Sequence, residues 1–73
     1  MTVEQLREVH HALPFRPFTI HTADGKSVPV PHSEFMSISP TGRTIVVQGE
    51  NDKLNIIDIR LVTQIEVHEA SPK

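Results

Sequence analysis

The sequence predicts a mainly β domain with one N-terminal helix, in which five short strands bend strongly into a small barrel. Apolar residues recur every three or four positions in the first thirteen residues and every second position after about residue 17. Tight-turn sequences then follow at short intervals. At 73 residues the chain is too short for a second domain. We therefore expect one domain over residues 1–73, with a helix at about 2–13, the barrel at about 15–68 and a frayed tail at 69–73.

The first thirteen residues carry the start, the apolar stripe and the end of a helix. Thr2 and Gln5 fit a capping box, in which each side chain bonds the backbone of the other residue. The apolar side chains at helical spacing are Val3, Leu6, Val9 and Leu13. Pro14 ends the helix because the residue before a proline is biased toward extended geometry. Such a short helix is unstable alone, so its stripe must cover the strands.

Beyond the helix, alternation of apolar and polar residues predicts strands. These lie at about 17–23, 26–31, 35–39, 43–49 and 53–59 or 64–68. Asp24-Gly25 is a hairpin signal, for which we expect positive φ at both central residues. Pro29 and Pro31 lack the N–H that a ladder needs, which places the second strand at an edge or ends it early.

Two further segments predict local structure before the third and the last strand. Ser33 is placed to cap a turn or a one-turn helix. Asp58 is placed to cap one helical turn over residues 59–62. Residues 54–59 are apolar on both faces, which predicts a bulge or burial on both sides. The core we expect consists of Leu6, Val9, Phe18, Ile20, Val28, Val30, Ile45, Val47, Ile56, Ile65 and Val67.

Composition narrows the classes of function. Seven basic and nine acidic residues give a net charge of −2 with no basic run, so the charge pattern that attracts nucleic acid is missing. No apolar run approaches the roughly 20 residues that span a bilayer, and no signal peptide precedes the helix, so we expect no membrane partner and a cytoplasmic location. The absence of cysteine excludes disulfides. We therefore expect oligomerisation to supply the additional stability that so small a core needs.

The residues that could carry chemistry do not form a recognisable site. The histidines are His10, His11, His21, His32 and His68. On a helix the adjacent His10 and His11 point about 100° apart, unlike a metal-binding pair on one face. Ser33-Glu34 beside His32 are contiguous, whereas a catalytic triad draws its members from separate elements. We therefore predict no catalytic, cofactor-binding or metal-binding residue, and a protein that is not an enzyme.

Scattered arginines suggest a second interpretation. Arg16 and Arg60 would contact phosphates if the chain bound RNA, and Phe15 could stack on a base. In a chain of net negative charge, dispersed arginines are more typical of a solvated surface.

Several stretches of the sequence carry a family resemblance. They are Pro14-Phe15-Arg16-Pro17-Phe18, Asp24-Gly25, Val30-Pro31-His32-Ser33-Glu34-Phe35, Ser39-Pro40-Thr41-Gly42-Arg43 and the ending from Ile57-Asp58 to Val67. Through them the chain resembles a family of short, uncharacterised bacterial proteins, which implies no activity.

The predicted plan of one helix and five bent strands is also similar, more loosely, to SH3-like barrels and to Sm-like RNA-binding proteins. Sm-like proteins assemble into rings and hold RNA in loops rich in Asp, Asn and an Arg-Gly pair. Here Arg60-Leu61 has no glycine, and Gly42-Arg43 is reversed and lies in the wrong turn. The resemblance thus implies the fold rather than the RNA site.

The functional prediction rests on strands that have apolar residues at successive positions. Residues 45–47 and 56–57 offer more apolar surface than one barrel interior and one short helix can cover. We expect Val46 and Ile57 at an interface that builds a homodimer or small ring, or that binds an unidentified protein. The predicted function is non-enzymatic protein interaction or self-assembly, and the alternative is an Sm-like RNA-binding module.

Overall fold

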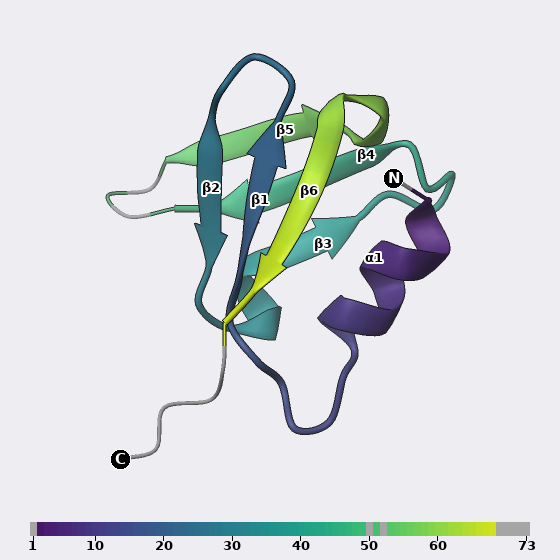
Figure 1. Cartoon of the computed structure of the whole chain (residues 1–73), viewed down its shortest axis with the longest axis vertical. Coiled ribbons are helices and arrows are strands. Elements are labelled where there is room, and N and C mark those ends of the chain that lie inside the picture. The colour runs from purple at the N-terminus through teal and green to yellow at the C-terminus, as the bar shows by residue number, and fades with distance from the viewer. Residues whose placement is uncertain (1, 50, 52, 69–73) are drawn as a thin grey trace.

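Two three-stranded antiparallel sheets and one α-helix are the main elements of the described part of the chain (Figure 1). The computed structural model describes residues 2–49, 51 and 53–68, so the predicted frayed tail at 69–73 lies outside the described residues. The elements are α1 (Val3–His10), β1 (Phe18–Thr22), β2 (Ser27–Val30), the 3-10 turn η1 (Ser33–Phe35), β3 (Met36–Ile38), β4 (Thr44–Gln48), β5 (Leu54–Asp58), the 3-10 turn η3 (Ile59–Leu61) and β6 (Val62–Val67).

The strand order is β2-β1-β6 in the first sheet, sheet A, and β3-β4-β5 in the second, sheet B. Figure 1 shows sheet A in front of sheet B with the strands crossing at a steep angle. The mainly β class with one N-terminal helix is confirmed, but the prediction of five strands in a barrel is wrong, because the described residues form six strands in two sheets that do not close into a barrel. Segments 54–58 and 62–67 are separate strands, and Pro31 and η1 interrupt the path from β2 to β3.

Helix α1 begins as predicted and ends early. The Gln5 amide donates to Thr2 Oγ1 and the Thr2 amide donates to Gln5 Oε1, both at 3.3 Å, so the capping box is confirmed. The helix ends at His10 rather than near residue 13, and the side chain of Leu13 is 94% exposed. Pro14 explains why Leu13, the last member of the predicted stripe, is not helical, since the residue before a proline is biased toward extended geometry. No helix in the described part of the chain is long and apolar enough to cross a membrane.

Both ends of α1 contact the segments that flank β3. At the C-terminal end, His10 Nε2 donates to the Ser33 carbonyl in η1 at 2.7 Å. At the N-terminal end, Val3 packs on Gly42 in the turn after β3, where a Cβ would lie 3.2 Å from Val3 Cγ2. Gly42 is also at φ +74°, a region that favours glycine.

The turns follow the predicted sequence signals with two differences. The hairpin at Asp24-Gly25 is present, but only Gly25 has positive φ, at +87°. The one-turn helix η1 is present, but its N-cap is His32 rather than Ser33. Asp58 caps η3 through a bond from the Arg60 amide, as predicted.

The core is formed by inward-facing side chains of both sheets, by Leu6 of α1 and by Ile59 of η3. The buried side chains are Leu6, Phe18, Ile20, Val28, Val30, Met36, Ile45, Val47, Ile57, Ile59 and Val62. Of the predicted core, Val9 and Ile65 are half-buried, whereas Ile56 and Val67 are exposed. The prediction missed Met36, Ile57, Ile59 and Val62.

Candidate interaction surface

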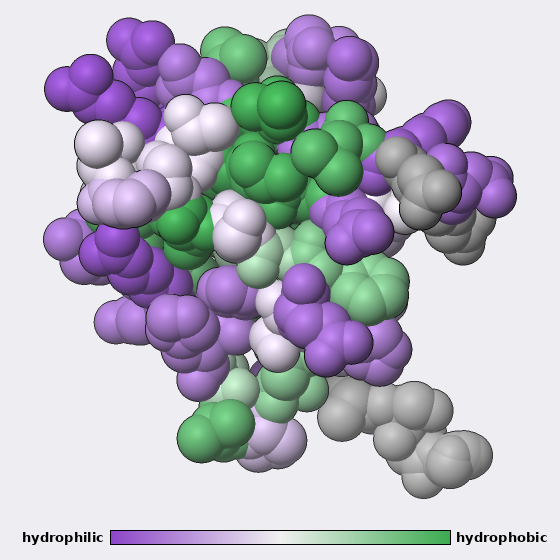
Figure 2. Space-filling model, turned by 180° about the vertical axis from the view of Figure 1, so that it is seen from behind, coloured by the Kyte–Doolittle hydropathy of each residue, from purple (hydrophilic) through white to green (hydrophobic). Residues whose placement is uncertain are grey.

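Apolar side chains gather on the outer face of sheet B and the adjoining turn η3. Leu54 is 60% exposed, Ile56 69% and Leu61 49%. Half-buried Val46 lies directly opposite Ile56 in the ladder, so the two side chains share this face. Leu54, Ile56 and Leu61 also line one hollow, and Figure 2 shows green areas on the side of the molecule away from sheet A. We call these four residues the apolar strip.

The strip contains one of the two predicted interface residues. Val46 faces outward, whereas Ile57 is only 7% exposed and faces the core opposite Ile45. The exposed residue of the pair is Ile56. Side chains alternate along a strand, so pairing with β4 fixes which of these adjacent residues is inside. On β4, Ile45 and Val47 are both fully buried, and Ile45 lies opposite Ile57. The alternation of β4, with Ile45 and Val47 inside, was the signal that could have placed Ile57 inside as well.

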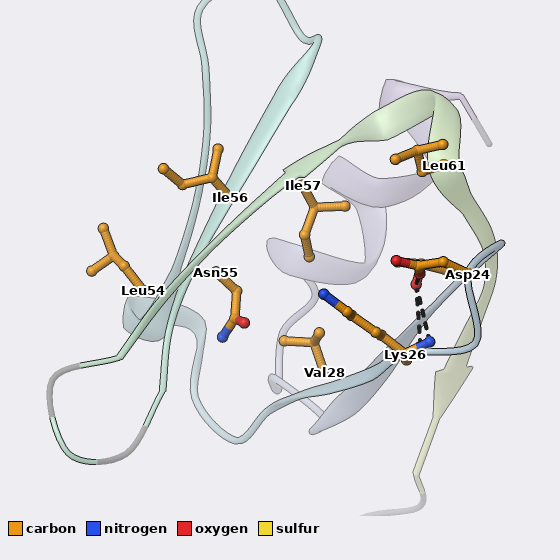
Figure 3. A pocket seen from close by; sticks show the side chains of 9 residues that line it. Asp24, Lys26, Val28, Leu54, Asn55, Ile56, Ile57 and Leu61 are labelled. Atoms are coloured by element: carbon orange, nitrogen blue, oxygen red, sulfur yellow. Dashed lines mark hydrogen bonds between the residues drawn. The ribbon is translucent and has the colours of Figure 1, made fainter.

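Beside the strip, a hollow of about 240 Å³ separates β5 from the β1–β2 turn (Figure 3). Its lining residues are Thr22, Asp24, Lys26, Val28, Leu54, Asn55, Ile56, Ile57 and Leu61. Asp24 accepts a bond from the Thr22 hydroxyl, which is the main cause that lowers the pKa of Asp24. Lys26, directly before β2, extends toward β5 in Figure 3. The hollow thus combines apolar walls with one acid and one base.

Arg60 forms an exposed ion pair at the end of β5. Its Nη2 lies 2.8 Å from Asp58 Oδ2, and its Nε donates to Asp58 Oδ1 at 3.2 Å. The side-chain bond from Arg60, followed by the bond from its amide, lowers the pKa of Asp58 to about 2, and Arg43 adds a smaller attraction. Because Asp58 already binds the guanidinium, Arg60 is partly neutralised as a phosphate contact.

Arg16, the other residue assigned to RNA contact, lies in a different hollow. That hollow is lined by Glu8, Val9, Ala12, Arg16 and Val67, between α1 and β6. Arg60 instead lines a hollow with Arg43, Asp58 and Ile59. The structure therefore does not bring Arg16 and Arg60 into one site, and it places an acidic side chain in each hollow.

The outer face of sheet A carries a polar row that sequence reasoning missed. His21 Nδ1 lies 3.1 Å from Ser27 Oγ, and His21 Nε2 lies 2.9 Å from Glu66 Oε1. Thr19 Oγ1 contacts His68 Nε2 at 2.9 Å on the same sheet. A serine, a histidine and a carboxylate in line are the side chains of a hydrolytic triad.

The surroundings of this row favour a structural role. Ser27 lines a hollow with Pro29, Pro31 and Phe35 that neither His21 nor Glu66 lines. Ser27 lies opposite His21 in the β1–β2 ladder, and Glu66 lies one diagonal position away on β6. Such cross-strand pairs stabilise a sheet. The row therefore links all three strands of sheet A.

The remaining histidines also have structural contacts. The rings of His10 and His11 lie 4.8 Å apart between centroids, closer than their expected directions on a helix would place them. His32 meets Phe35 edge-on at 5.6 Å. Among the residues that the structure describes, no group of three or more His, Cys, Asp or Glu side chains is arranged to hold a metal ion.

Comparison with known proteins gives no relative. No protein-family model, curated protein or solved structure matches this chain. Function is therefore inferred from the surfaces described above.

Proposed function

We propose that the chain is a non-enzymatic self-assembly module that forms a homodimer or a small ring through the apolar strip. The observation that carries this proposal is the exposure of Leu54, Ile56 and Leu61 on one side of a 73-residue chain. Single exposed apolar residues are ordinary on protein surfaces, whereas a contiguous apolar group favours an interface. Without disulfides, so small a core gains most from burial against a second copy.

The expected affinity is modest. Full burial of a Leu or Ile side chain contributes about 1.5–3 kcal/mol, and the three exposed members of the strip would gain roughly half to two-thirds of that in each copy. For two copies the total is about 6–10 kcal/mol, which must offset an association cost of about 4–15 kcal/mol. The most favourable balance, about 6 kcal/mol, corresponds to a dissociation constant of tens of micromolar, so we expect a weak, reversible assembly.

The two sheets also support a finer description of the fold. Read across both sheets, the strands follow the path β6-β1-β2 and then β3-β4-β5, and β2 and β3 are consecutive in the chain. We propose that β2 and β3 are two halves of one strand that bends at η1, so that the chain is an open variant of the SH3-like or Sm-like small barrel. The proposed kinship with short bacterial proteins rests on sequence stretches alone.

RNA binding ranks second among the proposed functions. Arg43 and Arg60 share one hollow, which is the observation in its favour. Against it stand the ion pair of Arg60 with Asp58, the separate place of Arg16 and the net charge of −2. Catalysis ranks below both, because the Ser27–His21–Glu66 row lies on an exposed sheet face rather than in a shared pocket.

Sedimentation equilibrium over a concentration series from about 1 to 500 μM tests self-assembly directly, since this range brackets a micromolar dissociation constant. The expected result is a mass that rises with concentration to a defined multiple of the 8.2 kDa chain. Ile56→Lys should shift the series to monomer, because it places a charge in the buried centre of the interface.

Gln64→Lys is the matched control. Gln64 is also exposed on a strand, but it belongs to β6 in sheet A, opposite His21. It should leave the assembly unchanged. A strictly monomeric mass throughout the series would remove self-assembly and leave a different protein as the partner of the strip.

A further inference from the structure

The backbone of β5 presents unpaired hydrogen-bonding groups beside the apolar strip. The β4–β5 ladder continues at one end in a bond from the Gly49 amide to the Lys53 carbonyl, 2.8 Å, and at the other in a bond from the Ile59 amide to the Arg43 carbonyl, 2.9 Å. Bonded and non-bonded pairs alternate in an antiparallel ladder. Asn55 and Ile57 therefore bond β4, whereas Leu54 and Ile56 lie at the alternate, non-bonded positions.

At these alternate positions Leu54 and Ile56 direct both N–H and C=O away from β4, and Asp58 directs its N–H the same way. Sheet B ends at β5, and no other strand among the described residues pairs with this side. The outward groups thus form a free edge next to exposed Leu54 and Ile56 side chains.

The edges of β2 and β3 are interrupted by proline or short. On β2, the bond from the Thr22 amide to the Lys26 carbonyl sets the phase, so Pro29 lies at an outward position with no N–H to offer. Pro31, directly after β2 and two positions from Pro29, also lies at an outward position and also lacks an N–H. Strand β3 has three residues, and one end of β6 shares a hollow with α1 that Val9 and Val67 line. Proline and short length are known protections against edge pairing, and β5 has neither.

We propose that β5 pairs antiparallel with β5 of a second copy, with Ile56 at the twofold axis, so that sheet B continues from one copy into the other. This geometry rests on the self-assembly proposed above and specifies its interface. The Ile56 N–H and C=O would bond the Ile56 backbone of the second copy. The Asp58 N–H would donate to the Leu54 carbonyl of the second copy. The twofold axis would repeat this bond from the second copy to the first.

The side chains are self-complementary in this arrangement. Residues opposite each other across a ladder share a face, so the two Ile56 side chains meet and each extends the apolar strip of the other copy. Only three exposed apolar side chains in each copy belong to the strip, which is few for a large obligate interface. We therefore expect a weak, reversible dimer rather than a permanent one.

Lys26 is the group expected to oppose this pairing. Its side chain extends toward β5 across the adjoining hollow (Figure 3), and lysine beside a free edge is a common means of limiting strand addition. The incoming strand would have to displace it. Lys26→Ala should accordingly strengthen dimerisation severalfold, and a weaker dimer in this variant would contradict the proposed approach of the second strand.

Amide hydrogen exchange tests the pairing residue by residue. In a sample that is nine-tenths dimer, the Ile56 amide should exchange about tenfold more slowly than in dilute monomer, because it exchanges only when the copies separate. The Ile57 amide bonds β4 in both states and should change far less. The Ile38 amide, outward on the edge of β3, is the control and should not change. Equal rates for Ile56 in monomer and oligomer would overturn the inference.

A synthetic chain with N-methyl-Ile56 removes the outward N–H and keeps the side chain. We expect it to stay folded and to dimerise at least tenfold more weakly, whereas N-methylation of Ile38 should have no effect. If N-methyl-Ile56 still assembles while Val46→Lys does not, the face of sheet B is the interface, and self-assembly stands without edge pairing. A monomeric unmodified chain would remove both proposals. If the N-methylated chain does not fold, the exchange rates decide.

The register has its own test. With Ile56 on the axis, Asn55 of one copy faces Ile57 of the other as a non-hydrogen-bonded pair, in which the Cα atoms approach to about 4.5 Å. A mixture of labelled and unlabelled chains should give an intermolecular contact between the α-protons of Asn55 and Ile57. Contacts between other pairs of residues would show a different register or interface.

Discussion

Val46 lies directly opposite Ile56 on the outer face of the β4–β5 ladder, and one step along, Ile45 lies opposite Ile57 on the inner face. Two adjacent isoleucines thus have opposite environments. Ile57 holds the two sheets together, whereas Ile56 is available to a partner. Substitutions at these neighbouring positions can therefore separate folding from association.

The first prediction compares Ile57→Ala with Ile56→Ala. Loss of the buried Ile57 side chain should lower the free energy of unfolding by about 2–4 kcal/mol. Loss of the exposed Ile56 side chain should change it by less than about 0.5 kcal/mol in the monomer. Urea denaturation at a concentration where the protein is monomeric measures both. A larger destabilisation by Ile56→Ala than by Ile57→Ala would mean that Ile56, and not Ile57, faces the core.

The second prediction concerns the acid side of the stability curve. Arg60 lowers the pKa of Asp58 from 3.8 to about 2 in the folded chain. The Asp58 carboxylate therefore stabilises the fold above pH 3.8, and this contribution is lost as the pH falls toward about 2. Wild type should melt at a higher temperature than Asp58→Asn near neutral pH, and the difference should shrink below pH 4. The exposed pair should also weaken in high salt. A constant difference down to pH 2 would contradict this assignment.

The third prediction separates two glycines with positive φ. Alanine at Gly25 or Gly42 should cost about 1–2 kcal/mol from backbone strain. At Gly42 the new methyl group also meets Val3 Cγ2 at 3.2 Å, whereas nothing lies within 4 Å of a Cβ at Gly25. Gly42→Ala should therefore cost about 1 kcal/mol more. In the Val3→Ala background, this excess should disappear; if it persists, the contact is not its cause.

The fourth prediction concerns nucleic acid. Seven basic residues dispersed among nine acids can neutralise few phosphates together, so binding to a single-stranded RNA oligonucleotide should be weak and fall steeply with salt. Fluorescence anisotropy at physiological salt should show no saturation in the micromolar range. Tight binding that Arg16→Ala and Arg60→Ala both abolish would favour the RNA-binding alternative over self-assembly.

The elements were predictable where their signals are local. The capping box of Thr2 and Gln5 and the cap at Asp58 involve residues a few positions apart. Glycine and proline likewise mark turns by their own backbone preferences. Each of these signals acts within a few residues and does not depend on strand pairing, which is why strand positions agreed within about two residues.

The faces of β5 were not predictable in the same way. Leu54 and Ile56 compete with Ile57 and Ile59 for the inner face, and hydrophobic alternation alone gives no preference. Pairing with β4 decides between them. The Ser27–His21–Glu66 row was missed for a related reason, since only the pairing of β1 with β6 brings Glu66 beside His21, 45 positions away.

The two contacts of α1 at the ends of β3 have a mechanical consequence. An eight-residue helix is about 12 Å long, and the Val3–Gly42 and His10–Ser33 contacts join its two ends to the segments on either side of β3. Tension applied to the N-terminal segment would pass first into the short strand β3 and into the bend that joins the two sheets. Strand β5, on the opposite edge of sheet B, would carry that load last. A fusion at the N-terminal end should therefore leave the proposed interface unstrained.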